Sequence, residues 1–224
     1  SKLDFVMDNM IRVYENVLSQ EFCQKLIDKF ESSDDKTVWN DYRKFSDTLL
    51  LENPEYWRDE IPVCLDAFTQ IIEKYKNDLP WPDQHKKLFP KQYTLEGIKL
   101  KKYSPNDIDE FPWHVDVTTG ETCLRFLAFF IYLDDNDAGE TEFVEGRTSS
   151  TLVKCVGGRA IVFPPMYPWV HCGRKPVKKP KYLLQSYLHY VLPNQDSSKQ
   201  KLESEARLSS VSYTHLTLPT KVTV

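Results

Sequence analysis

Two segments in the first hundred residues carry apolar positions at the spacing of an amphipathic helix. The first runs over about residues 20–31, with Ser19 as its predicted N-cap. Its apolar stripe consists of Phe22, Leu26, Ile27 and Phe30. The second is expected from about Asp59 to Lys76, since a proline such as Pro62 is tolerated in a first turn. Its predicted buried stripe consists of Val63, Phe68, Ile71, Ile72 and Tyr75.

The segment between these helices has a different pattern. Ser32 to Pro54 mixes charged residues with aromatic ones and shows neither a helical nor a strand period. We expect a long loop there, lying over a site. With the flanking helices, this segment predicts a helical support over about residues 1–92.

After Tyr93 the hydrophobic period changes to two, which is typical of β-strands. Strands are expected at about 97–103, 123–133, 141–144, 151–155, 159–163 and 182–191. Short strands that follow helices, and do not alternate with them, indicate an antiparallel sandwich or barrel. The predicted fold class is mainly β with α support, with a barrel core over about 93–192 and the N-terminal helices packed on one face.

The end of the chain differs in composition from the predicted barrel. Residues 193–210 are polar and charged, and they are expected to be solvated or weakly helical. Residues 211–224 have the β-propensity of an edge strand but also resemble translated adapter sequence, so they receive no functional weight. The sequence therefore predicts one domain over 1–192 and a disordered or non-native tail over 193–224.

Composition and charge narrow the class of protein further. The chain has 224 residues, of which 41% are hydrophobic and 28% charged, as in folded globular domains. Its formal net charge of -4 provides no global attraction to nucleic acid or to an anionic membrane. The longest apolar run, Phe126 to Leu133, is far shorter than the roughly 20 residues of a membrane-spanning helix. No secretory signal pattern opens the sequence, so we expect a cytoplasmic protein without membrane partners.

Two histidines and an aspartate form a candidate metal site. His114 and Asp116 are spaced i and i+2, so both side chains point to the same side of an extended segment. His171 follows a strand-like segment further along the chain. Two histidines with one carboxylate suit Fe(II) and leave coordination positions open. A His-x-Asp pair alone is a weak signal, because such pairs often form only a hydrogen bond.

A lysine near the C-terminal end of the predicted barrel adds a second signal. Lys181 begins the segment KYLLQSYLHYV, whose alternation places it on one face with Leu183, Gln185 and Tyr187. A lysine on such an inward face needs a partner, because an unpaired buried ammonium group is costly. The carboxylate of a bound acid would serve.

These residues lie within a longer series of motifs in a fixed order. The series comprises Tyr103-Ser-Pro, His114-Val-Asp116, Ile131 to Asp134, Gly139 to Phe143, Gly158 to Phe163, His171-Cys-Gly173, Pro176-Val177 and Lys181-Tyr182. In order and spacing, the segment from about Ile98 to Val191 resembles the catalytic domain of the prolyl 4-hydroxylase-like branch of the Fe(II)/2-oxoglutarate-dependent oxygenases. This resemblance covers about 95 of the 224 residues.

The resemblance implies a double-stranded β-helix, or jelly-roll, and a set of functional residues. His114, Asp116 and His171 would be the iron ligands, and Lys181 would bind the distal carboxylate of 2-oxoglutarate. Tyr103 and Tyr132 match positions that can contact this cosubstrate. The implied cofactors are Fe(II), 2-oxoglutarate and O2, with ascorbate as a further candidate.

The implied function is hydroxylation of an unactivated C–H bond by an Fe(II)- and 2-oxoglutarate-dependent dioxygenase. A prolyl residue in a peptide or protein is the first candidate substrate, and a free amino acid or other small molecule is the next. An oxygenase acting on nucleic acid is an alternative, with the basic run Arg174 to Lys181 as its phosphate contact. That run has no interleaved aromatic residues, so nucleic acid is not favoured. A non-catalytic metal-binding jelly-roll is the third alternative. The sequence does not indicate an oligomeric state.

Overall fold

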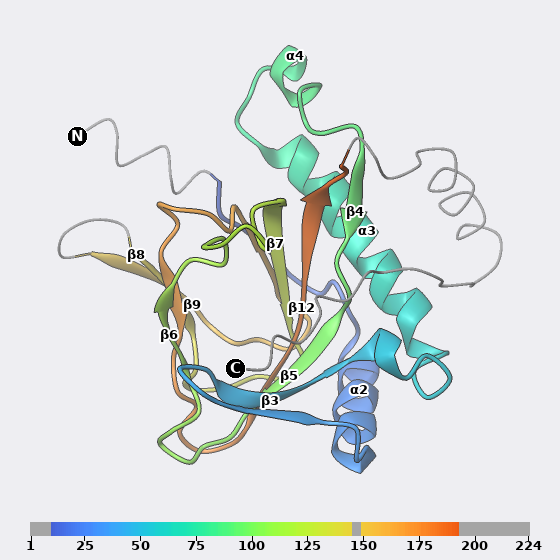
Figure 1. The fold of residues 1–224 in the computed structure, drawn as a ribbon, viewed down its shortest axis with the longest axis vertical. Helices are drawn as coiled ribbons and strands as arrows, with labels where there is room; N and C mark the ends of the chain where they lie inside the picture. The colour runs from blue at the N-terminus through green and yellow to red at the C-terminus, as the bar shows by residue number, and fades with distance from the viewer. Residues whose placement is uncertain (1–9, 145–148, 193–224) are drawn as a thin grey trace.

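The computed structural model describes residues 10–144 and 149–192, which form two β-sheets and a pair of long helices (Figure 1). The predicted tail at 193–224 lies outside the described residues. The larger sheet has the strand order β1 (Arg12–Tyr14), β10 (Ala160–Phe163), β7 (Arg125–Tyr132), β12 (Lys181–Tyr190), β5 (Lys99–Tyr103), β3 (Lys44–Leu49) and β2 (Thr37–Asn40), and β4 (Tyr93–Leu95) pairs with β12. The smaller sheet has the order β6 (Phe111–His114), β11 (His171–Gly173), β8 (Thr141–Val144) and β9 (Ser150–Val153).

The strands from β5 to β12 form a jelly-roll. β5, β7, β10 and β12 lie in the larger sheet, whereas β6, β8, β9 and β11 lie in the smaller one. Every strand pair is antiparallel. All six strands expected from the period of two are present, and the predicted fold class is confirmed.

The helices α2 (Gln20–Ser32) and α3 (Glu60–Asp78) cover the face of the larger sheet that points away from the smaller one (Figure 1). Ser19 caps α2, because its side chain accepts a hydrogen bond from the Phe22 amide at 3.1 Å. Alternate residues of the sheet, such as Phe129 on β7 and Leu184 on β12, pack into this helical layer. A third helix, α4 (Asp83–Lys86), and a 3-10 turn, η1 (Leu50–Glu52), complete the described elements.

One residue of the predicted helical stripes was wrong. Val63 does not belong to the buried stripe of α3, since 43% of its surface is exposed. Ile61 and Cys64 are buried instead, which rotates the buried face slightly about the helix axis. In α2, Cys23 is fully buried and Phe22 is only partly buried. Large apolar residues at the edge of a helical face gave the misleading pattern.

The loop predicted between the helices was also wrong over most of its length. Residues 37–40 and 44–49 form the hairpin β2–β3, and β3 pairs with β5 at the edge of the larger sheet. The support predicted over 1–92 therefore contributes strands as well as helices. A period of two was not visible in β3, because Asp47 and Phe45 share the face toward the smaller sheet while Ser46 and Thr48 lie on the other.

The second face of the larger sheet packs against the smaller sheet. Its apolar residues include Phe130 on β7, Phe163 on β10 and Leu183 on β12, which meet Phe143 from β8. Buried polar side chains share this face, among them Asp47, Lys101, Lys181 and Gln185. Polar groups buried between two sheets are costly unless they have partners, so they mark the part of the fold that serves a site.

None of the helices in the described part of the chain has the length and apolar character that a membrane span requires.

Replacing Phe68 with alanine tests the packing of α3 on the sheet. The ring is fully buried, and its centroid lies 5.7 Å from that of Phe129. Phe68→Ala is expected to lower the free energy of unfolding by about 3–5 kcal/mol, because it leaves a cavity in this layer. Val63→Ala, on the exposed side of the same helix, is the control and should change it by about 0.5 kcal/mol or less. Chemical denaturation measures both, and equal effects would contradict the assigned faces of α3.

Candidate metal centre and adjoining cavity

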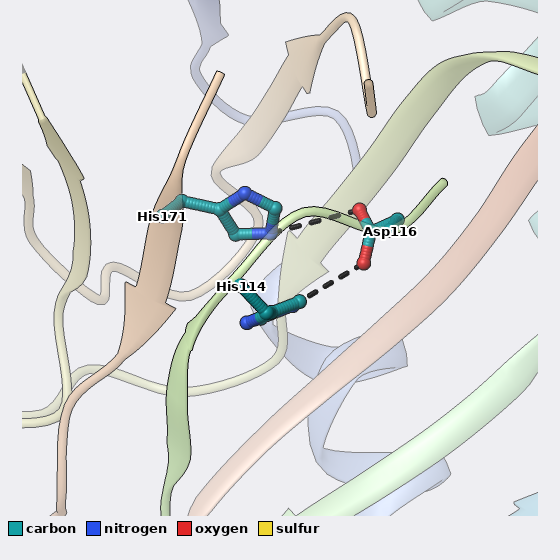
Figure 2. A group of neighbouring side chains, drawn as sticks. All are labelled: His114, Asp116 and His171. Atoms are coloured by element: carbon teal, nitrogen blue, oxygen red, sulfur yellow. Dashed lines mark ion pairs between the residues drawn. The ribbon is translucent and has the colours of Figure 1, made fainter. Parts of the chain in front are cut away.

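The three candidate metal ligands meet where β6 and β11 run side by side (Figure 2). His114 ends β6 and His171 begins β11, and these two residues are direct partners in the antiparallel pair. Asp116 follows β6, where its amide donates a hydrogen bond to the carbonyl of Pro165 at 2.8 Å. The ligand atoms of the three residues all lie within 4.8 Å of one another. The fold therefore brings distant parts of the chain to one point.

Hydrogen bonds to the backbone fix the tautomer of both histidines. The Nδ1 atom of His114 lies 2.6 Å from the carbonyl oxygen of Pro112, and that of His171 lies 3.0 Å from the carbonyl oxygen of Trp169. A carbonyl oxygen cannot donate, so Nδ1 carries the proton in each ring. The Nε2 lone pairs are then free to bind a metal ion.

Both Nε2 atoms are turned toward the carboxylate of Asp116 (Figure 2). The distances are 3.3 Å from His114 and 3.6 Å from His171. With the protons on Nδ1, these contacts set lone pairs against lone pairs. Asp116 Oδ2 and His171 Nε2 are also buried without a hydrogen-bond partner among the described residues. A cation between the three groups would satisfy all of them, so the residues fit a bound metal.

The protonation states suit the same chemistry. Burial alone would raise the pKa of Asp116, but at low pH the protonated rings of His171 and His114 attract the carboxylate and lower its pKa to about 2. Burial lowers the pKa of His171 below its ordinary value. Near neutral pH the site therefore offers a carboxylate and a neutral imidazole, the forms that bind metals. Two histidines and one carboxylate are typical of non-haem Fe(II) sites with open positions.

Aromatic rings hold the two imidazoles in place. Phe111 stacks on His114, with 3.8 Å between ring centroids, and Phe163 meets His171 edge-on at 4.8 Å. The side chain of His171 is 1% exposed, whereas that of His114 is 17% exposed. Solvent therefore reaches the centre from the His114 side.

A cavity between the two sheets adjoins the centre. Its walls include both histidines together with Lys181, Tyr103, Lys101 and Gln185. The alternation of β12 predicted that Lys181, Leu183 and Gln185 share a face, and the structure places all three on the cavity wall. Trp113, by contrast, points outward and is half exposed.

Lys181 is 2% exposed and retains an unused donor toward the cavity. Its Nζ donates hydrogen bonds to the carbonyl oxygens of Gly139 at 2.9 Å and Arg174 at 3.1 Å, and it lies 4.3 Å from the ring centroid of Tyr103. An ammonium group has three N–H donors, so one remains. Gly173 keeps the space beside Nζ open, since a Cβ there would lie 3.4 Å from it. Burial lowers the pKa of Lys181 to about 8, so the charged form prevails at neutral pH.

The two candidate tyrosines are placed differently. Tyr103 lines the cavity beneath the Lys181 ammonium group. Tyr132 is fully buried, and its hydroxyl is hydrogen-bonded to the side chain of Thr141 and accepts from the Thr141 amide at 3.1 Å. Thr141 itself lines the cavity. Tyr132 thus lies behind the cavity wall and supports Thr141.

Lys101 is a cavity residue that the motifs in the sequence did not indicate. It is 6% exposed on β5, and it faces the cavity because it is two residues from Tyr103 on the same strand. Its Nζ lies 4.5 Å from the ring centroid of Phe45 and 5.5 Å from that of Phe111. Burial, followed by the nearby charge of Lys99, lowers its pKa to about 7. The alternation with Tyr103 was the available signal, but three lysines within four positions look like a solvated face.

No family model matches the chain, and no curated protein sequence does either. Solved structures do match. A viral collagen prolyl hydroxylase from Paramecium Bursaria Chlorella virus-1, in its 2OG complex, has a TM-score of 0.60 and 18% identity, covering 84% of this chain and 99% of that one. A prolyl-4-hydroxylase from Pseudomonas putida has a TM-score of 0.60 and 14% identity, covering 85% and 100%.

A third similar structure is a prolyl hydroxylase from Trichoplax adhaerens, in complex with a peptide fragment of the hypoxia inducible factor oxygen degradation domain. Its TM-score is 0.60 at 11% identity, covering 90% of this chain and 92% of that one. These similarities at low identity define the fold. The chain has the jelly-roll fold of the prolyl hydroxylases, as the resemblance in sequence implied.

Alanine variants of the three ligands test the metal centre. His114→Ala, Asp116→Ala and His171→Ala are each expected to weaken Fe(II) binding at least about 100-fold, because each removes one of three converging ligand atoms. Anaerobic calorimetry measures the affinity, and circular dichroism checks that the fold is retained. His85→Ala, on an exposed residue of α4, is the control and should bind like the unaltered protein. Near-normal Fe(II) affinity in His171→Ala would contradict the assignment.

Proposed function

We propose that the protein is an Fe(II)- and 2-oxoglutarate-dependent oxygenase that hydroxylates an unactivated C–H bond, with a prolyl residue in a peptide or protein as its first candidate substrate. One observation carries this proposal. A centre with three converging ligand atoms adjoins the same cavity as a buried ammonium group with a free donor. A dicarboxylate that chelates a metal at one end needs this combination.

Each residue has a distinct role in this proposal. His114, Asp116 and His171 hold the iron, and Lys181 binds the distal carboxylate of 2-oxoglutarate beside Tyr103. Bound Fe(II), with 2-oxoglutarate and O2, supplies the oxidant that converts C–H to C–OH, and ascorbate is a candidate for keeping the iron reduced.

The protein supplies shape and charge around this chemistry. Phe111, Phe130 and Leu183 line the cavity and limit the access of water to it. Tyr132 holds Thr141 in the wall from behind. The two carbonyl acceptors fix Nζ of Lys181, so little side-chain entropy remains to be lost when an acid binds.

The substrate assignment draws support from the similar structures. They are named as prolyl hydroxylases, and one of them holds a peptide. A fold hosts several substrate classes, so a free amino acid or another small molecule is the second candidate. The cytoplasmic location stays a prediction from the sequence.

The basic run at 174–181 gives little support to a nucleic-acid substrate. Arg174 pairs with Glu142 at 2.6 Å, and Lys179 pairs with Asp134 at 2.7 Å. Lys181, the last residue of the run, is buried in the cavity. Few of these charges are therefore free to contact a phosphate backbone. A non-catalytic metal-binding jelly-roll is also disfavoured. Metal binding alone does not require a buried lysine with a free hydrogen-bond donor, as Lys181 has.

Succinate release tests the proposed reaction directly. The protein is loaded with Fe(II) and 2-oxoglutarate without oxygen and is then exposed to O2 with a panel of proline-rich peptides and free amino acids. We expect succinate in amounts that rise with the correct substrate, together with a substrate mass increase of one oxygen atom. His171→Ala provides the background. Release no greater than that of His171→Ala across conditions that load the iron would contradict the proposed function.

Lysine variants test how the cosubstrate is held. Removing one member of a desolvated ion pair costs on the order of 3–5 kcal/mol, so Lys181→Ala should weaken 2-oxoglutarate binding by about two to three orders of magnitude. Lys179→Ala is the matched control. Lys179 is about half exposed and pairs with Asp134 at the surface, so its removal should change the free energy of 2-oxoglutarate binding by about 1 kcal/mol or less. Anaerobic titration of both Fe(II) complexes measures the difference. Equal weakening, or none in Lys181→Ala, would contradict the role of Lys181.

A further inference from the structure

Lys101 is a second buried lysine on the cavity wall, and it has no role in the proposed function as described above. Within the described residues, its Nζ has no hydrogen-bond acceptor and no carboxylate at ion-pair distance. Asp47 is opposite Lys101 on β3: its Oδ1 accepts a hydrogen bond from Trp39 at 2.9 Å, and its Oδ2, which has no hydrogen-bond partner among the described residues, lies 3.8 Å from Nζ of Lys99. An ammonium group buried in such a site is unfavourable unless a ligand pairs with it.

Strand register places Lys101 at the level of the metal centre. Across the β5–β12 pair, Tyr103 is opposite Lys181 and Lys101 is opposite Leu183. Lys101 is therefore two residues, or about 6.5–7 Å of strand, from the level of Lys181. On the facing sheet, Gly173 lies beside the Lys181 ammonium group, and His171 is two residues further along β11.

Contacts with aromatic rings agree with this placement. Nζ of Lys101 lies 5.5 Å from the ring centroid of Phe111, and that ring stacks on His114 with 3.8 Å between centroids. Nζ of Lys181 instead lies 4.3 Å from the ring centroid of Tyr103. The two lysines therefore lie at different levels of one cavity.

The length of 2-oxoglutarate matches this separation. Its two carboxyl carbons are joined by four C–C bonds of about 1.5 Å, which span about 5 Å when extended. The carboxylate oxygens add to this span at each end. An acid with its distal carboxylate on Lys181 consequently places its other carboxylate beside the metal, at the level of Lys101.

We propose that Lys101 binds the carboxylate adjacent to the keto group of 2-oxoglutarate, so that two buried lysines hold the acid at both ends. This inference rests on the proposed function. The three metal ligands hold the metal, and Lys101 adds a side chain that binds the chelating end of the acid directly. The assigned ligand chemistry is a 2-oxo carboxylate beside a metal.

The affinities of two acids for three lysine variants distinguish binding at the metal end of the cavity from binding at the Lys181 end. The protein is loaded with Mn(II), and calorimetry or competition titration measures the affinity for 2-oxoglutarate and for 2-oxopentanoate, which lacks the distal carboxylate. Lys101→Met should weaken the binding of both acids about tenfold or more. Lys181→Met should weaken the binding of 2-oxoglutarate alone. Lys99→Met, one pleat further along β5, is the control and should change neither affinity by more than about twofold.

The outcomes are distinct. Lys101→Met that binds both acids like the unaltered protein would overturn the inference while leaving the proposed function intact. The inference would also be overturned if Lys101→Met lowered the affinity for Mn(II) but left the acid affinity of the metal-saturated protein unchanged. Lys101 would then only balance the charge of Asp116. Lys101→Gln serves as a second variant, and circular dichroism checks the fold of both. An unaltered Mn(II) protein that binds neither acid would contradict the proposed function itself.

Discussion

The central strands of the larger sheet, β7, β10 and β12, are buried on both faces, and this constraint determines which side chains β12 can carry. One set of alternate residues, such as Leu184 and Leu188, packs against the helices, and the other set faces the smaller sheet. Most side chains in both layers are apolar, but the second set also presents Lys181 and Gln185 to the cavity. Because a strand has a period of two, shifting the register by one residue would place Lys181 among the helices. The hydrophobic pattern of β12 thus positions the charge.

The candidate metal centre lies on the smaller sheet, across the cavity from β12. β6 and β11 present their histidines toward the larger sheet, and backbone carbonyls two residues away fix the proton of each on Nδ1. The remaining lone pairs then meet the Asp116 carboxylate with no proton to share between them. The fold maintains this arrangement by burying His171 among Phe163 and Phe143. A bound cation would supply the missing attraction, and the cavity that both histidines line also contains the two lysines.

Local patterns in the sequence indicated much of the fold and the candidate site. The spacing of His114 and Asp116 is a property of one extended segment, and the alternation that buries Lys181 is a property of one strand. Features that depend on tertiary context were missed. β3 lacks an apolar period because Asp47 faces inward, and Val63 lies on the solvent side of α3. Lys101 was not selected from the sequence, because three lysines within four positions are typical of a solvated face and only the pairing of β5 between β3 and β12 buries it.

The central claim is that one cavity holds a metal and a dicarboxylate at adjoining positions. Crystals grown with Mn(II) and 2-oxoglutarate, measured for anomalous scattering from manganese, test this claim most directly. The account expects one strong anomalous peak bounded by His114 Nε2, His171 Nε2 and the Asp116 carboxylate. Continuous density for the acid should extend from that peak to the ammonium group of Lys181. A manganese peak bound elsewhere, or an acid that does not reach Lys181, would contradict the account.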